Sequence, residues 1–398
     1  MLKEKVKALI AENESKLISR RRELHNYPEL SSQEHQTVAY LKKELAHLNL
    51  ETYDVKNSTG FYMIFDTQKA GQTIGLRTDI DALPVNEPKM NLKQERTCHS
   101  KNPGVMHACG HDGHMATLIT AIEILVALKE YLSGKLVFIF EEGEETHSGI
   151  LPMIDALKEI KFDAIYGAHL LANLETGKVG LDSGSVMSGL ARIAFDVIGK
   201  GGHGSRPDLS INPIYATANI LTNLASAWVN QLDVTKTVTL GITQVIGGEA
   251  LNVFPEKVFV GGTLRFFDVA AGEKGLEVLK KITSQIAKAH NCQIAFHDNM
   301  ELALLPVVND EKLAEIAKKA ALDIFPEIEI IPGANWFASE TFTHYQKLAP
   351  TCFALVGTKN EELGSGAEHH NQFFDLDEAS LKYNLGIMVM FVLTLMNR

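Results

Sequence analysis

The sequence predicts an α/β protein with two domains, one of them inserted into the other. At 398 residues, the chain exceeds the length at which a single hydrophobic core usually stops growing. Short apolar runs alternate with helical segments in the first part of the chain, a pattern typical of α/β sheets. The pattern changes near Val186 and reverts after about Leu304, which indicates an insertion.

Helices and buried strands alternate through the first part of the chain. Amphipathic segments predict helices at 3–24 and 33–48, with Ser31 or Ser32 as the N-cap of the second. A further helix at 113–131 is apolar nearly all round, so we expect it to be buried. The expected strands are the apolar runs 61–65, 73–76, 136–140 and 164–168. Such continuous apolar strands favour a sheet that is covered on both faces.

The middle of the chain has the element order of a ferredoxin-like α+β domain. The expected order is strand, helix, strand, strand, helix, strand, at 191–198, 211–232, 237–245, 257–264, 272–290 and 292–297. After that segment the α/β pattern resumes to the end of the chain. We therefore predict one domain formed by 1–187 and 301–398, and an inserted domain at 188–300.

Composition and charge disfavour several kinds of partner. A formal net charge of −11, with no run of Lys and Arg, argues against nucleic acid and anionic membranes. The N-terminus lacks the apolar core of a signal peptide, and the apolar stretch 387–396 is too short to span a bilayer, so we expect a buried helix there. The chain is too long for its four cysteines to suggest a disulfide framework. We predict a cytoplasmic protein with reduced thiols.

The densest cluster of metal-binding residue types is Met106–His114, with the sequence MHACGHDGH. Three of the fifteen histidines fall within 107–114, together with Cys109. Histidine nitrogen and cysteine sulfur suit zinc and neighbouring transition metals, and Gly110 and Gly113 allow the backbone to turn sharply. Two other interpretations stay open: a loop of packed or solvated histidines, and a nucleophilic cysteine activated by a histidine base.

An acidic run, Glu141–Glu145, follows the expected strand 136–140 directly. Its four carboxylates repel one another, so a bound cation or solvent must relieve them. The run lies at the carboxyl end of a buried strand, where open α/β sheets place their sites. Adjacent glutamates can also divide the work of a hydrolase, one binding metal and the other acting as general base. A solvated acidic loop is the alternative.

The remaining candidates are more isolated in the sequence. His169 ends the apolar strand 164–168, and Glu368–His370 precedes the C-terminal helix. A lone histidine in either place is more often a packed or capping residue, so these positions gain weight only as part of a set. Asp79 and Asp81 are candidate ligands, turn formers or groups that orient ligating histidines, and we favour the orienting role for Asp79.

The glycine-rich segment Gly199–Ser205 does not match the phosphate-binding pattern GxxxxGK[ST]. It also lacks the strand–loop–helix setting of that pattern, so we reject nucleotide binding. We expect the segment to expose His203 on a turn.

Together these motifs resemble the M20 metallopeptidase family, most closely its amidohydrolase branch of aminoacylases, hippurate hydrolases and auxin-conjugate hydrolases. The match spans nearly the whole chain in order, and MHACGHDGH is its most specific part. The other matching segments are Arg22–His25, Pro28–Leu30, Arg77–Pro84, Glu144–Glu145, Gly167–His169, Gly201–His203, Asn252–Pro255, Gly262–Arg265, Ser339–Phe342, His370 and Phe374–Glu378. The resemblance implies a zinc-peptidase-like catalytic domain with a central mixed sheet, and an inserted lid that forms a homodimer.

The resemblance also implies roles for individual residues. Glu144 falls on the general base, and His203 falls on a catalytic lid residue that reaches the active site of a partner subunit. Asn252 and Arg265 fall on lid residues that touch substrate. The positions that match ligands of one or two divalent ions (Zn, Mn, Co or Ni) are Cys109, His111, Glu145, His169 and His370. The implied reaction is hydrolysis of the amide bond in a small N-acyl amino acid.

The chain departs from the family pattern in three places. Glu141–Gly143 replaces the usual Gln-Pro-Ala, which adds negative charge and bears on metal preference. Thr341 stands where Asp is frequent, and Asp208 follows Pro207 where His is frequent, so both bear on specificity. The alternatives are a metal-dependent dipeptidase or carboxypeptidase, a cysteine-nucleophile amidohydrolase, and a non-catalytic ligand-binding relative.

Overall fold

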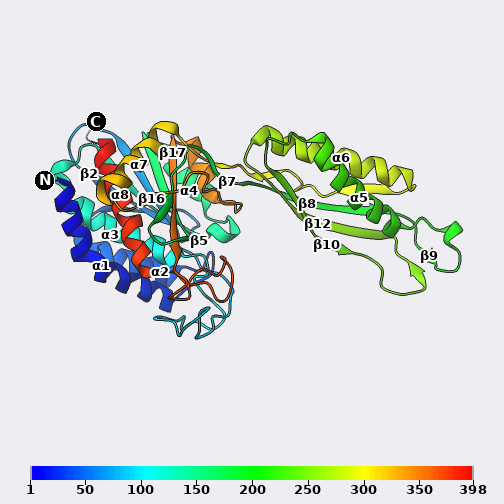
Figure 1. Ribbon diagram of the computed structural model, residues 1–398, viewed down its shortest axis with the longest axis horizontal. Helices are drawn as coiled ribbons and strands as arrows, with labels where there is room; N and C mark the ends of the chain where they lie inside the picture. Colours follow the sequence, from blue (N-terminus) through cyan, green and yellow to red (C-terminus); the bar gives the residue numbers. More distant parts are fainter. Residues whose placement is uncertain (1, 397–398) are drawn as a thin grey trace. The chain divides into compact units, whose positions relative to one another are not determined.

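The computed structural model describes residues 2–396, which divide into two compact units (Figure 1). The first unit comprises Met1–Gly184, Val308–Asn335 and His344–Arg398. The second comprises Ser185–Val307 and Trp336–Thr343. The second unit therefore includes a short late segment of the chain in addition to the continuous stretch.

The first unit is built on an eight-stranded mixed sheet, as the sequence predicts. Its central strands β4, β3, β5 and β17 are parallel, and antiparallel pairs flank them. In sheet order the strands are β1 (Glu51–Asp54), β2 (Phe61–Asp66), β4 (Lys135–Glu141), β3 (Thr73–Asp79), β5 (Ala164–Glu175), β17 (Thr351–Lys359), β6 (Lys178–Gly180) and β16 (Glu329–Ile330). The chain leaves β3 for β4 on one side and returns to β5 on the other. Such a switch point is where open α/β sheets bind ligands.

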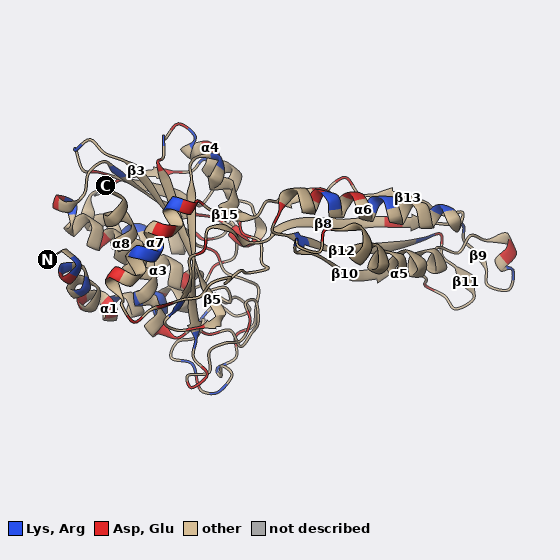
Figure 2. Cartoon of the chain, turned by 45° about the horizontal axis from the view of Figure 1, so that its top comes forward, with Lys and Arg blue, Asp and Glu red and all other residues tan. Residues whose placement is uncertain are grey.

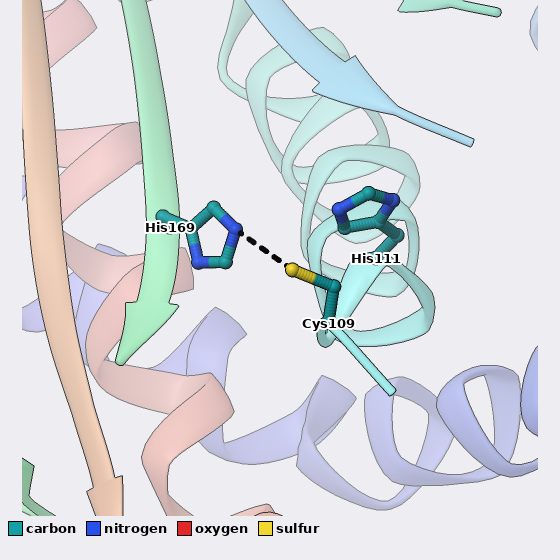
Figure 3. Close-up of side chains that lie close together, drawn as sticks. All are labelled: Cys109, His111 and His169. Carbon is teal, nitrogen blue, oxygen red and sulfur yellow. Dashed lines mark hydrogen bonds between the residues drawn. The ribbon is translucent and has the colours of Figure 1, made fainter. Parts of the chain in front are cut away.

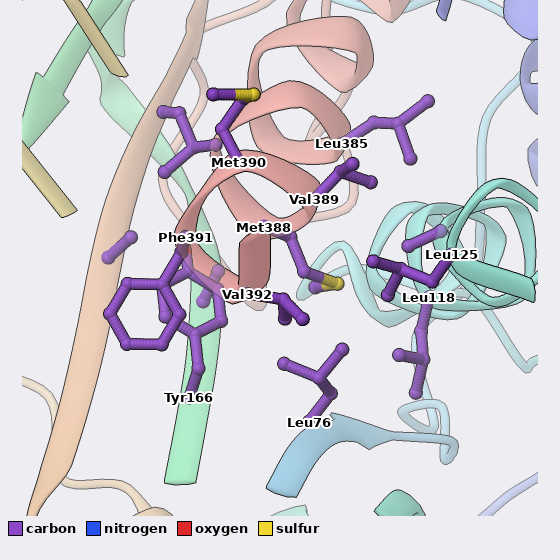
Figure 4. Close-up of a cluster of buried hydrophobic side chains, with 14 of the residues drawn as sticks. Leu76, Leu118, Leu125, Tyr166, Leu385, Met388, Val389, Met390, Phe391 and Val392 are labelled. Carbon is purple, nitrogen blue, oxygen red and sulfur yellow. The ribbon is translucent and has the colours of Figure 1, made fainter. Parts of the chain in front are cut away.

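Helices cover this sheet and fill the core of the first unit. They are α1 (Leu2–Asn26), α2 (His35–Leu45), α3 (His111–Ala127), α4 (Ile150–Leu157), α7 (Glu311–Ile324) and α8 (Leu381–Met396). Helix α3 is buried nearly all round, as its composition predicts, although it begins two residues earlier than expected. Helix α8 packs against α1, α3 and α7, and in Figure 4 its side chains meet Leu76 of β3 and Tyr166 of β5.

The C-terminal helix corrects one expectation about membranes. The stretch 387–396 is by itself too short to span a bilayer. The apolar helical segment is longer: Glu378–Met396 has 19 residues and is long and apolar enough to cross one. However, 78% of its most apolar window is buried inside the protein. Burial of this kind is the expected behaviour of a core helix, and the prediction of a buried C-terminal helix is confirmed.

The start of α2 also differs from the expectation that Ser31 or Ser32 caps it. The carboxylate of Glu29 accepts the backbone N–H groups of Gln36 at 3.2 Å and Thr37 at 2.8 Å, and so satisfies the first turn. Capping therefore comes from a residue outside the local N-cap position, which a local sequence pattern does not reveal.

The second unit has the β-α-β-β-α-β order expected of its sequence. Its main elements are β8 (Gly189–Ile198), α5 (Pro213–Gln231), β10 (Val238–Ile246), β12 (Lys257–Phe266), α6 (Val269–Ala289) and β13 (Gln293–Phe296). The strands form an antiparallel sheet in the order β10-β12-β8-β13, and β14 (Leu302–Leu304) also pairs with β8. Strand β9 (Gly202–His203) pairs antiparallel with β11 (Val253–Phe254), and the short strands β7 (Gly184–Met187) and β15 (Val307–Asn309) form another two-stranded sheet.

Packing of α8 on the sheet predicts a large cost for truncating Phe391. Its ring is fully buried, with its centroid 4.8 Å from that of Tyr166. We expect Phe391→Ala to cost about 3–5 kcal/mol of unfolding free energy in the first unit. Leu322→Ala in α7, at a side chain that is 48% exposed, is the control and is expected to cost less than about 1 kcal/mol.

Urea unfolding followed by far-ultraviolet circular dichroism measures this difference. Tryptophan fluorescence is unsuitable because Trp228 and Trp336 both belong to the second unit. An equal loss of unfolding free energy in the two variants would contradict the proposed packing role of Phe391.

Candidate metal centre

Four separate segments of the first unit supply the residues that the sequence analysis selects as metal ligands. Cys109 precedes α3, and His111 is the first residue of that helix. Gly110 between them has φ of 87°, which a residue with a side chain rarely adopts. Glu145 lies in the short 3₁₀ helix Glu144–Thr146 that follows β4. His370 is brought beside the cysteine because its backbone N–H donates to the carbonyl of Ala108 at 2.9 Å.

His169 lies within β5 and does not end it, because the strand continues to Glu175. Pairing between β3 and β5 stops at Leu76 and Tyr166, whereas β5 remains paired with β17 through His169. The histidine therefore lies just beyond the point where β5 parts from β3. This position is the switch point of the sheet, which explains how a mid-strand residue reaches the site.

The five candidate ligands form two groups that share the cysteine. In each group, the possible ligand atoms lie within 4.8 Å of one another: Cys109, His111 and His169 in one, and Cys109, Glu145 and His370 in the other. Figure 3 shows the first group, in which Cys109 Sγ is 3.6 Å from His169 Nε2. In the second, His370 Nε2 is 3.3 Å from Glu145 Oε1.

Two unsatisfied atoms indicate that this arrangement fits a divalent cation. His111 Nε2 and Glu145 Oε1 are both buried, neither has a hydrogen-bond partner, and they lie 3.8 Å apart. Leaving buried polar atoms unpaired is costly, so such atoms call for a ligand. Imidazole nitrogen, thiolate sulfur and carboxylate oxygen together suit borderline divalent metals. The residues present therefore fit one or two divalent ions.

Hydrogen bonds fix the tautomers of two histidines so that their Nε2 atoms are available as ligands. His111 Nδ1 donates to the backbone oxygen of Asp81 at 2.9 Å and lies 3.2 Å from the Asp81 carboxylate. His169 Nδ1 donates to the carbonyl of Leu170 at 2.8 Å. In both rings Nδ1 carries a proton, so Nε2 is the atom that can bind a cation.

His114 occupies the same histidine-rich run but is already saturated. Its Nδ1 is 2.7 Å from the carboxylate of Asp79, and its Nε2 accepts the backbone N–H of Leu170 at 2.9 Å. Asp79 thus holds His114 by a short hydrogen bond and lies 3.8 Å from His111 Nε2. The carboxylate that orients the candidate ligand His111 directly is that of Asp81, the member of the pair that the sequence analysis favoured less.

His369 also contacts the site, although the sequence indicates it only as a member of the segment Glu368–His370. Its Nε2 accepts the backbone N–H of Ala172 at 3.1 Å, so its proton is on Nδ1. That Nδ1 lies 3.6 Å from Cys109 Sγ and can donate to the sulfur. Which of the neighbouring residues His369 and His370 is the metal ligand depends on how each ring faces the site, and the sequence alone does not determine this.

The acidic run is neither solvated nor uncompensated. Glu141 is fully buried and accepts from Arg77 Nε and from the hydroxyl of Tyr345, each at 2.8 Å. Glu142 accepts from the hydroxyl of Ser32 at 2.6 Å and from the backbone N–H of Thr59 at 2.8 Å. The departure from the family pattern thus brings its own hydrogen-bond partners, and the two remaining glutamates face His111.

The state of the Cys109 thiol weighs against its use as a nucleophile. Burial raises its pKa well above the usual range, and Glu145 adds to the increase against the opposing effect of His111. Nucleophilic cysteines require the opposite shift, toward a thiolate at neutral pH. All four cysteines are free. A bound cation is the natural partner for a deprotonated sulfur at this position.

The three candidate residues of the inserted segment lie in the second unit. His203 is exposed in β9, and its Nδ1 accepts from the backbone N–H of Ser205 at 3.1 Å and contacts that residue's hydroxyl at 2.8 Å. Asn252 is exposed, and its carbonyl accepts from Gly204 at 2.7 Å. Arg265 in β12 is partly buried and donates to the hydroxyl of Ser339 at 3.0 Å.

A mixed α/β sheet that brings nitrogen, sulfur and carboxylate donors together at its switch point defines a candidate site for divalent metal ions. Comparison with known proteins places the chain more narrowly. The model of peptidase family M20/M25/M40 matches residues 75–394. The protein therefore belongs to the M20 family, as its motifs predict.

Named relatives and a solved structure resemble the chain over most of its length. An N-acyl-L-amino acid amidohydrolase of Geobacillus stearothermophilus is 36% identical over 78% of this chain and 82% of its own. An N-acetyl-L-cysteine deacetylase of Bacillus subtilis is 30% identical over 92% of this chain and 85% of its own. A dinuclear metal-binding peptidase of the M20 family from Bacillus subtilis superposes with a TM-score of 0.83 at 28% identity, covering 97% of this chain and 99% of that one.

Substitution of Cys109 tests whether it is a metal ligand. We expect Cys109→Ser to lower the number of divalent ions per chain, because serine hydroxyl is a poor replacement for thiolate sulfur. Elemental analysis after dialysis measures the content. Cys292→Ser, at another buried cysteine in the second unit, is the control and should keep the wild-type content. An acyl group trapped on Cys109 and detected by mass spectrometry would contradict the assignment.

Proposed function

We propose that this M20 enzyme hydrolyses the amide bond of N-acyl amino acids and releases a carboxylic acid and a free amino acid. One observation supports the chemistry above all: Glu144 and Glu145 both lie within 4.8 Å of His111 through their ligand atoms, and Glu144 is buried. Two adjacent carboxylates at one metal centre can serve as ligand and as general base. The names of the relatives support the substrate class.

The metal ligands in this proposal are Cys109, His111, Glu145, His169 and His370. The bound ions would supply Lewis acidity, which lowers the pKa of water and polarises the carbonyl group of a substrate. Glu144 takes the proton of the attacking water and then delivers it to the nitrogen of the leaving amine. A general base held next to the reacting atoms contributes about 10²–10⁴-fold to the rate.

The second unit contributes the groups that stabilise charge and grip the substrate. Because His203 Nδ1 accepts the N–H of Ser205, its proton is on Nε2, and that N–H can donate to the oxyanion that develops on the substrate. Arg265 is suited to the substrate carboxylate through the paired donors of its guanidinium group. Asn252 would contact the substrate as a second residue of this unit.

A hydrolysis screen tests this function directly. N-acetyl, N-benzoyl and longer N-acyl amino acids should be cleaved faster than dipeptides when Zn, Mn, Co or Ni is supplied to metal-free protein. The donor set suits all four ions, so the screen also identifies the preferred one. Faster cleavage of dipeptides by the best metal form would replace the proposal with a dipeptidase. Activity that survives complete metal removal would refute it.

Substitution of Glu144 tests the assignment of the general base. We expect Glu144→Gln to lower kcat by about 10²–10⁴-fold or more, while the metal content stays near that of the wild type. The amide keeps the size of the side chain but does not accept the proton. Retention of more than about a tenth of the wild-type rate would show that another group is the base.

We also propose that the second unit acts as a lid and forms a homodimer in the cytoplasm. Helix α5 has no Lys, Arg, Asp or Glu in its 19 residues, as its uniform colour in Figure 2 reflects, yet Tyr215 and Val229 on it are 68% and 71% exposed. Strand β10 is the last strand of its sheet and exposes Val245 and Ile246. An uncharged helix and an apolar edge strand favour contact with a second copy.

Mixing two inactive variants tests whether His203 acts across this interface. In a shared-site dimer of His203→Ala and Glu144→Gln chains, one site combines a wild-type Glu144 with a wild-type His203 from the other chain. Activity should return to at most about a quarter of the wild-type value, because half of the dimers are mixed and half of their sites are intact. If a tag pulldown proves exchange and no activity returns, His203 does not act in trans.

A further inference from the structure

The segment Ser31–Glu34, between α1 and α2, is hydrogen-bonded to the site at three points. Ser31 donates to Asp81 Oδ2 at 2.7 Å, and the same oxygen accepts the backbone N–H of Glu145 at 3.1 Å. Ser32 donates to Glu142, as described above. The third contact belongs to Glu34, whose side chain is fully buried.

Both carboxylate oxygens of Glu34 are used by other segments of the chain. Oε1 accepts the backbone N–H of Gly143 at 2.9 Å, and Oε2 accepts the hydroxyl of Thr59 at 2.7 Å. Gly143 immediately precedes the proposed base Glu144. A carboxylate from a distant part of the chain therefore holds the backbone of the loop that carries the base.

Glu34 makes this contact although it stands next to the start of a helix. It occupies the N-cap position of α2, where a short polar side chain ordinarily accepts the N–H groups of the first turn, yet its carboxylate makes no such bond. Glu29 accepts those N–H groups instead. The carboxylate of Glu34 is thus directed to the loop and not to its own helix.

The loop turns sharply at Gly143, in a backbone conformation that glycine adopts readily and other residues rarely adopt. Gly143 has φ of 56°, and a Cβ atom at this position would lie 2.1 Å from Ser148 Oγ. The turn directs the chain from β4 into the 3₁₀ helix that carries Glu144 and Glu145. The Gly143 N–H donates to Glu34, so this bond fixes the orientation of the peptide just before the base.

We propose that Glu34 is a positioning residue for hydrolysis, which holds Glu144 in place by accepting the N–H of Gly143. The inference rests on the assignment of Glu144 as general base. Burial raises the pKa of Glu34 to about 7, with Asp81 adding to the increase against the hydrogen bonds of Thr59 and Gly143. A neutral side chain that keeps an acceptor toward Gly143 can therefore replace the carboxylate, and glutamine meets this requirement.

Three variants of the metal-loaded enzyme separate positioning from folding. Glu34→Ala removes the acceptor, Glu34→Gln keeps an oxygen for Gly143, and Gln33→Ala changes an exposed neighbour as the control. For Glu34→Ala we expect kcat to fall about 10–100-fold while KM and metal content change less than about threefold, because misplacement by about 1 Å costs up to about 10²-fold. Glu34→Gln should stay within about threefold of the wild-type kcat.

Hydrogen exchange of the peptide that contains Gly143 gives a readout that does not depend on catalysis. Its amides should exchange at least about tenfold faster in Glu34→Ala than in Glu34→Gln. Wild-type kcat in Glu34→Ala, or a kcat as low in Glu34→Gln as in Glu34→Ala at full metal content, would overturn the proposal. Failure of the wild-type enzyme to cleave any amide refutes the proposed function instead, whereas the exchange difference still tests the Glu34–Gly143 contact.

Discussion

The candidate metal centre depends on the hydrogen bonds that the carboxylate of Asp81 makes. It lies 3.2 Å from His111 Nδ1 and accepts the backbone N–H of Glu145 and the hydroxyl of Ser31, so one buried group joins α3, the catalytic loop and the N-terminal segment. Burial acts to raise its pKa, but the hydrogen bonds with His111, Ser31 and Glu145 and the charge of His111 together outweigh burial and lower the pKa. Asp81 therefore stays ionised at neutral pH, and both candidate ligands that it touches are held without using their metal-facing atoms.

Buried charge in this unit is tolerated because each group has a specific partner. Glu141 is matched by Arg77, which also donates to Asp79 at 2.8 Å, and Asp79 in turn holds His114. These contacts leave the Nε2 of His111 and the Oε1 of Glu145 as polar atoms without hydrogen bonds. Because the surrounding charges are already paired, a cation that enters interacts mainly with the atoms that lack partners. The carboxylate of Asp81, which is engaged by His111 and by the backbone N–H of Glu145, orients these two residues and does not compete for the ion.

The sequence predicts the parts of this site that are local in the chain. MHACGHDGH, the paired glutamates and the apolar strands are short contiguous patterns, so the sheet, the buried helix α3 and a metal site around Cys109 and His111 could be inferred from them. The assignment of His169 and His370 to the same site comes from the resemblance to the family. Contacts between distant segments could not be inferred. The choice of Asp81 over Asp79 depends on which carboxylate faces the Nδ1 atom of His111. Likewise Glu29, and not Ser31 or Ser32, accepts the N–H groups of the first turn of α2, while Glu34 accepts the N–H of Gly143. Such choices are settled by tertiary packing, on which a local pattern carries no information.

The proposed mechanism assigns its roles to two units whose local structures differ. The proton acceptor and the metal donors need a buried, preorganised setting, and the switch point of the mixed sheet provides it. His203 is instead exposed in the short strand pair β9–β11, with its Nδ1 occupied by Ser205 so that Nε2 carries the proton. In the proposed mechanism Glu144 accepts a proton, whereas His203 donates a hydrogen bond, and the two residues belong to different units. Each unit would therefore supply the group that its own structure suits: a buried acceptor from the sheet, and an exposed donor whose tautomer is fixed by a neighbouring residue.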